Sequence, residues 1–146
     1  MQKVIFIVGL PGSGKTFLGK RLQDAFNSAG IKNLFIDDAS TKDQIKIVLG
    51  LMKSGETFKD LAFDNTEFLI ITDPMLCHKQ AQEVAKESFH GVTQTWVYFE
   101  NNPEQCVKNI HGRDERVISP GWVTHLSQIY HIPEDAFIHK VFCKES

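Results

Sequence analysis

The residues at positions 9–16, GLPGSGKT, have the types and spacing of a phosphate-binding loop, G-x-x-x-x-G-K-[ST]. Glycines let successive backbone N–H groups curl around a phosphate chain without a Cβ in the way. The lysine brings a mobile positive charge to the terminal phosphates, and the threonine hydroxyl is a ligand for the accompanying Mg²⁺. We therefore expect a nucleoside triphosphate, ATP, to bind with magnesium at Pro11, Gly12, Ser13, Gly14, Lys15 and Thr16.

Three carboxylates follow apolar runs and could act on a bound phosphate. Asp37 and Asp38 come directly after residues 31–36. Asp37 is the predicted general base that takes a proton from an acceptor hydroxyl, and Asp38 would orient it or help to bind the metal. Asp73 ends the run 68–72, where a carboxylate holds magnesium, caps the helix predicted to begin at Pro74, or does both. Motor ATPases usually have a glutamate after this aspartate, so the proline favours phosphate transfer over hydrolysis.

Arg113 and Arg116 lie in a short charged segment between two predicted helices. An arginine that closes over the transferring phosphoryl group stabilises its charge in the transition state. We predict that residues 108–118 form a small lid and that one of these two arginines is catalytic. The alternative is a solvated turn in which both arginines pair with Asp114 and Glu115.

Apolar segments that alternate in period predict the elements that must position these side chains. Continuous apolar runs, typical of buried parallel strands, occupy residues 4–8, 31–36, 68–72, 93–99 and 137–142. Helical spacing and end signals predict helices over 17–29, 40–55, 74–91 and 103–112, and over 120–133 with Trp122, Val123, Leu126, Ile129 and Tyr130 facing inward. This alternation predicts one α/β domain over residues 1–146, with a three-layer architecture and a five-stranded parallel sheet. Ligands of such sheets bind at the carboxyl ends of the strands.

Composition narrows the classes of function. The chain has 146 residues and a net charge of −2, which argues against a protein that coats long nucleic acid electrostatically. Its three cysteines, Cys77, Cys106 and Cys143, lack metal-site spacing and read as reduced thiols, so we expect a cytoplasmic protein. The apolar run 4–8 is too short to cross a membrane, and no membrane partner is expected. The chain has no guanine-reading [NT]-K-x-D motif, which makes a regulatory GTPase a poor fit.

These motifs, taken in order, resemble those of the small P-loop kinases related to phage and bacterial 5′-hydroxyl polynucleotide kinases. The resemblance rests on residues 9–16, on the pair Asp37 and Asp38, on the run ending at Asp73, and on residues 102–130 with their two arginines. It implies a P-loop NTPase fold with the third strand beside the first, Asp37 as the general base, and a nucleic-acid 5′ end as a candidate partner. The arginine with which that family grips a backbone phosphate has no counterpart in residues 38–42.

The expected function is therefore ATP-dependent transfer of the γ-phosphate to a hydroxyl of a nucleotide or nucleic acid. Two alternatives stay open. One is a kinase of small metabolites or nucleoside monophosphates, which the net negative charge mildly favours. The other is an ATP-binding regulatory protein with little turnover.

Overall fold

The computed structural model describes residues 3–37, 66–111 and 120–143. Its strands are β1 (Lys3–Val8), β2 (Asn33–Ile36), β3 (Phe68–Thr72), β4 (Thr93–Phe99) and β5 (Ile138–His139). Its helices are α1 (Lys15–Ser28), a 3₁₀ turn η3 (Pro74–Cys77), α3 (Lys79–Ser88), α4 (Pro103–Ile110) and α5 (Pro120–Ile129). The helix predicted over 40–55 and residues 112–118 of the predicted lid lie outside the described residues.

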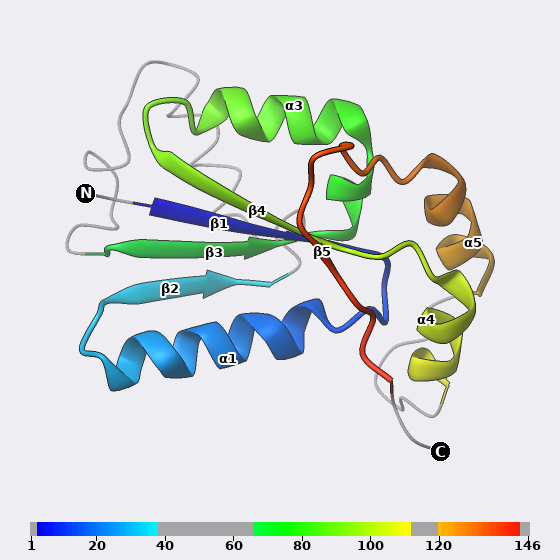
Figure 1. Ribbon diagram of the computed structural model, residues 1–146, viewed down its shortest axis with the longest axis horizontal. Coiled ribbons are helices and arrows are strands. Elements are labelled where there is room, and N and C mark those ends of the chain that lie inside the picture. Colours follow the sequence, from blue (N-terminus) through cyan, green and yellow to red (C-terminus); the bar gives the residue numbers. More distant parts are fainter. Residues whose placement is uncertain (1–2, 38–65, 112–119, 144–146) are drawn as a thin grey trace.

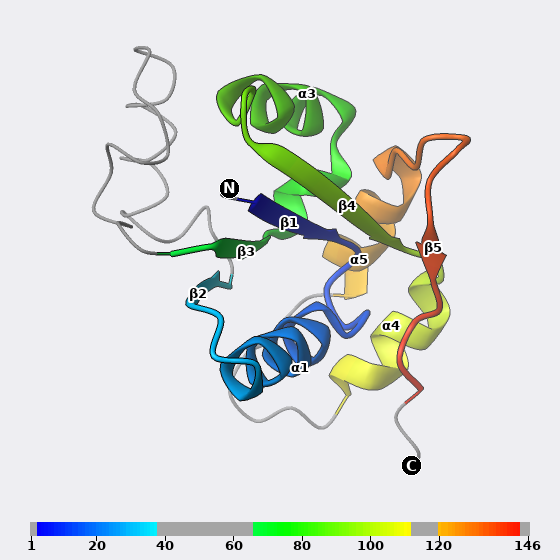
Figure 2. The same ribbon diagram turned by 60° about the vertical axis from the view of Figure 1, so that its left-hand side comes forward.

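The strands form one parallel sheet in the order β2-β3-β1-β4-β5. The predicted α/β architecture is confirmed, and so is the expectation that the third strand lies beside the first. Figures 1 and 2 show α1 on one face of the sheet and α3 on the other, with α4 and α5 beyond the carboxyl end of β4. The central strand β1 is covered on both faces, which explains its unbroken apolar run.

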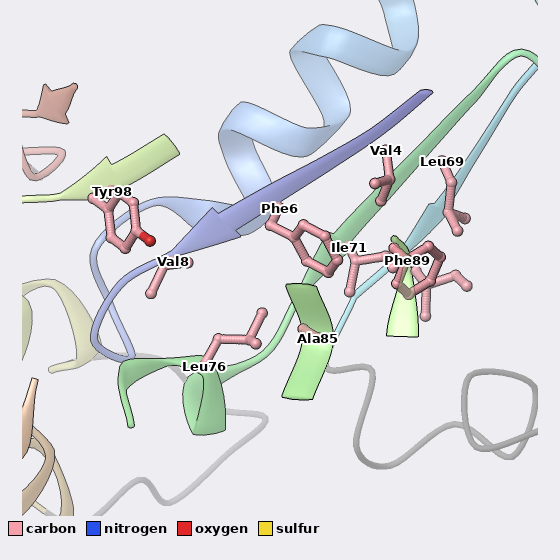
Figure 3. Close-up of a cluster of buried hydrophobic side chains, with 10 residues drawn as sticks. Val4, Phe6, Val8, Leu69, Ile71, Leu76, Ala85, Phe89 and Tyr98 are labelled. Carbon is pink, nitrogen blue, oxygen red and sulfur yellow. The ribbon is translucent and has the colours of Figure 1, made fainter. Parts of the chain in front are cut away.

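The two faces of β1 supply two separate cores. Val4, Phe6 and Val8 pack with residues of β3, β4 and α3 (Figure 3). The Phe6 ring also stacks on Trp96, with ring centroids 4.2 Å apart. Ile5 and Ile7 face the other way and pack with side chains of α1. This alternation follows from the period of two along a strand.

The helix predicted over 74–91 is divided in the structure, a correction to the prediction. The Asp73 carboxylate accepts a hydrogen bond from the Met75 N–H at 2.7 Å and caps the tight turn η3. His78 then takes an extended backbone conformation, and α3 begins at Lys79. The Cys77 carbonyl accepts a hydrogen bond from the His131 N–H instead of continuing a helix. Apolar spacing cannot reveal such a break because both pieces bury residues on the same side.

Three further expectations about the elements are wrong in detail. Trp122 is 40% exposed rather than inward-facing, since Val123 and Leu126 occupy the buried side of α5. The strand predicted over 137–142 contains only Ile138 and His139, because β5 pairs only with the last two residues of β4 before the chain turns toward the phosphate loop. The second strand begins at Asn33, after Ile31 has donated its N–H to the Phe26 carbonyl.

No helix among the described residues is long and apolar enough to cross a membrane.

Candidate nucleotide site

The predicted phosphate loop connects β1 to α1, as the sequence indicates. Gly12 and Gly14 have φ angles of +85° and +110°, a region that side chains with a Cβ rarely adopt. Gly14 is the N-cap of α1, and no side chain caps that end of the helix. The first turn of α1 therefore presents the positive end of its dipole toward the loop, and its N–H groups are not capped by a side chain.

The Lys15 side chain lies against the backbone of the loop. Its Nζ atom donates hydrogen bonds to the carbonyl oxygens of Gly9 and Leu10, both at 2.9 Å, and the side chain is almost fully buried. These contacts hold the ammonium group against the first two residues of the loop. Because neutral carbonyls attract a cation less strongly than phosphate oxygens do, the group can turn toward a bound triphosphate.

Thr16 and Asp37 meet at the start of α1 and the end of β2. The Thr16 Oγ1 hydroxyl donates to Asp37 Oδ2 at 2.8 Å. The Thr72 hydroxyl, at the end of β3, donates to the other carboxylate oxygen, Oδ1. Two hydroxyl groups from neighbouring chain segments thus fix the orientation of the predicted general base beside the predicted magnesium ligand.

The oxygen atoms of this cluster suit Mg²⁺, which binds carboxylate and hydroxyl oxygens and retains substrate phosphates and waters as its other ligands. A metal ion held partly by the nucleotide does not need a dense protein cage. No group of three or more His, Cys, Asp or Glu side chains that could hold a metal is found among the described residues.

Not all predicted site residues can be placed. Asp73 is buried at the carboxyl end of β3, where capping of η3 is confirmed and the metal-binding role stays a prediction. Asp38, Arg113 and Arg116 lie outside the described residues, so their roles also stay predictions.

Two thiols lie near the loop and are unsuited to nucleophilic chemistry. Cys77 and Cys106 belong to a buried cluster that includes Leu10. Burial raises the pKa of Cys77 to about 12 and that of Cys106 to about 11, against a partial lowering by Lys15. Both side chains are therefore neutral thiols at physiological pH. They pack with Leu10 of the loop in that cluster.

Sequence reasoning missed two residues that contact this site, Thr72 and Asn109. Asn109 is buried in the last turn of α4, and its Nδ2 atom donates to the Gly12 carbonyl at 2.9 Å. A weak signal existed for each. Thr72 is the polar residue of an otherwise apolar strand, and Asn109 follows the buried Cys106 by three positions, on the same face of α4.

Comparisons with known proteins support the fold. No family model matches the chain. It is 28% identical over 123 residues to the uncharacterized protein R277 of Acanthamoeba polyphaga mimivirus, an alignment that covers 78% of this chain and 75% of the relative.

Several solved kinases share the architecture. The APS kinase CysC of Mycobacterium tuberculosis, in complex with AMPPNP and APS, superposes with a TM-score of 0.66 at 14% identity, over 95% of this chain and 88% of that one. A gluconokinase from Sinorhizobium meliloti gives 0.60 at 14% identity, over 96% and 82%. A fungal RNA kinase gives 0.55 at 14% identity, over 99% and 76%. The chain therefore has the fold of P-loop kinases.

Proposed function

We propose that this chain is an ATP-dependent phosphotransferase that moves the γ-phosphate to a hydroxyl of a nucleotide or nucleic acid. The observation that carries the proposal is the 2.8 Å hydrogen bond between Thr16 and Asp37. It brings a carboxylate from the end of β2 next to the loop that would hold the triphosphate. A carboxylate at this point can take a proton from an acceptor hydroxyl, a step that phosphate transfer needs and ATP binding alone does not.

Each part of the site has a role in this proposal. The loop backbone, Lys15 and the N-terminus of α1 hold the phosphates. The Thr16 hydroxyl would hold Mg²⁺ through its oxygen while it donates its hydrogen bond to Asp37. Asp38 or Asp73 would complete the oxygen ligands of the ion. When bound, the ion neutralises charge on the phosphates. Arg113 or Arg116 would close over the γ-phosphate from the lid.

Asp37 has the capacity to act on an acceptor while it stays oriented. An ionised carboxylate offers about four lone-pair sites, and the two hydroxyls in the structure use one site on each oxygen. An acceptor hydroxyl can therefore donate to a remaining site. The carboxylate would take its proton as the oxygen attacks the γ-phosphorus and the bond to the bridging oxygen of ADP breaks.

Asp37→Asn tests the proposal, because the amide nearly keeps the shape of the side chain but cannot take up the proton. We expect turnover with labelled ATP to fall about 10²- to 10⁴-fold, while the Kd for ATP changes less than about threefold. Asp24→Asn, an exposed aspartate on α1, is the matched control and should leave both quantities unchanged. The acceptor panel should contain oligonucleotides, nucleosides, nucleoside monophosphates and sugars. Label that enters no nucleic acid and no nucleotide would refute the acceptor class.

A kinase of small metabolites is the second candidate. The absence of an arginine in residues 38–42 favours a small-metabolite acceptor, because polynucleotide kinases bind a backbone phosphate of their substrate with an arginine at this place. It predicts label in a sugar or another small hydroxyl compound from the same panel. A regulatory ATP-binding protein predicts instead that ATP raises the melting temperature and that Asp37→Asn changes no activity.

A further inference from the structure

We propose that Asn109 is a positioning residue that locks the phosphate loop in its binding conformation by joining it to α4 and to the C-terminal segment 141–143. Through these contacts it sets the affinity for nucleotide phosphates. The inference rests on the proposed nucleotide site, but it does not depend on the identity of the phosphate acceptor.

The contacts of Asn109 connect three parts of the chain. The side chain is 2% exposed, and its Nδ2 atom donates to the carbonyl oxygens of Gly12 and Phe142. Its Oδ1 atom accepts from Gln105 Nε2 at 2.9 Å, one helical turn earlier on α4. Both protons of the amide and its oxygen are thereby engaged, which fixes the orientation of the side chain.

The loop has no room to shift toward α4. A Cβ added to Gly12 would lie 2.5 Å from the Cys106 carbonyl oxygen and 2.9 Å from Ile110 Cγ1. The loop backbone therefore rests directly on the backbone of the helix that carries Asn109. The C-terminal segment closes the loop from another side, where the Phe142 N–H donates to the Ser13 carbonyl at 3.0 Å.

These bonds have a direct consequence for phosphate binding. A peptide unit is planar and its C=O and N–H point in opposite directions, so holding one of them fixes the other. Phe142 holds the Ser13 carbonyl and hence aims the Gly14 N–H, at the N-cap of α1, away from the C-terminal segment. Asn109 holds the preceding carbonyl, that of Gly12, and so fixes the Gly12–Ser13 peptide unit directly. By also holding the Phe142 carbonyl, it keeps in place the residue whose N–H bonds to the Ser13 carbonyl. Donors aimed before the ligand arrives need not be ordered during binding, which improves affinity.

Titration of Mg²⁺–ATP into Asn109→Asp by calorimetry tests the proposal. The substitution keeps the shape and the acceptor for Gln105 but replaces the donor with an oxygen that repels both carbonyls. We expect the Kd for ATP to rise about tenfold or more. Gln105→Met is the matched control, because it leaves in place both donor bonds of Asn109, which are the contacts that hold the loop; its Kd should stay within about threefold of wild type. Asn109→Ser, neutral and shorter, should also weaken binding and replaces Asn109→Asp if that variant does not fold.

A second pair of variants tests the C-terminal contact. Phe142→Pro removes the N–H that holds the Ser13 carbonyl, whereas Phe142→Ala removes the ring and keeps the N–H. The proline variant should bind ATP several-fold more weakly than the alanine variant. Equal affinities in this pair, or an unchanged Kd in the Asn109 variants, would overturn the inference while leaving the proposed function intact. A wild-type protein that binds no ATP would overturn both, and one that binds ATP without transferring phosphate would overturn only the proposed function.

Discussion

Replacing Gly12 with alanine should destabilise the protein in an amount that the structure allows to be worked out. The φ angle of +85° disfavours any residue with a Cβ, at a cost of about 1–2 kcal/mol. The new methyl group would also lie 2.5 Å from a backbone oxygen of α4, and relieving such an overlap costs about 1–3 kcal/mol. The lower entropy of the unfolded alanine chain offsets about 0.4–1 kcal/mol. The net loss is therefore about 1–5 kcal/mol.

Thermal unfolding, followed by circular dichroism without nucleotide, measures this loss. For a domain of this size each kcal/mol lowers the melting temperature by about 4 °C, so Gly12→Ala should melt roughly 4–20 °C below wild type.

Gly30→Ala is the matched control for this substitution. Gly30 has a similar φ of +71°, but a Cβ there would meet nothing within 4 Å. Its melting temperature should fall by no more than about 6 °C, because the variant has the cost of a positive φ and the offsetting entropy of the unfolded chain but no steric overlap. The difference between the two variants isolates the contact of the loop with α4. If both variants melt within about 2 °C of each other, the loop does not rest on the helix as described.

Two further predictions concern side chains around the loop. Thr72→Val removes the hydroxyl that orients Asp37 and should lower turnover about tenfold with little change in ATP affinity. Thr72→Ser keeps a hydroxyl and should retain most of the wild-type turnover. Equal rates for the two variants in the kinase assay would contradict the orienting role. The pKa values of Cys77 and Cys106 rise on folding from 9.0 to about 12 and 11, so the folded state binds the two thiol protons more tightly than the unfolded state does. This difference stabilises the folded state below pH 9, and the stabilisation is lost as the pH rises toward 11–12. The guanidinium midpoint should fall over that range, and substituting both cysteines with alanine should flatten the fall. At pH 8 iodoacetamide should modify the exposed Cys143 alone, as mass spectrometry of digested protein would show.

Much of the fold could be predicted because the two central strands are buried on both faces. Apolar runs identify β1 and β3 to within one residue, since both strands contribute to the core on each face of the sheet. The bounds of β4 are also predicted, although only its last two residues, Tyr98 and Phe99, are fully buried. The errors occur where tertiary contacts override local pattern. Phe17 belongs to the apolar spacing of α1, yet it is half exposed and packs against Phe142 from the far end of the chain.

The site could be predicted in part for a similar reason. The loop and Asp37 follow local patterns, namely a motif and a carboxylate at a strand end. Thr72 and Asn109 act through hydrogen bonds that span 35 and 97 positions of the sequence. A polar residue in an apolar context signals that a partner exists, but nothing in its neighbours identifies that partner.

The position of β1 in the sheet has a consequence for how the chain folds. Its residues are the first of the sheet to be synthesised, yet Lys3 pairs with Phe68 on one side and with Thr93 on the other. The loop that follows depends on Asn109 and Phe142, which are made later still. During synthesis, the apolar segment that becomes β1 therefore has both edges unpaired until its partner strands are made, and this state is prone to aggregation. The nascent chain would gain its nucleotide site only as the last of these partners dock, so nucleotide binding reports the completion of folding.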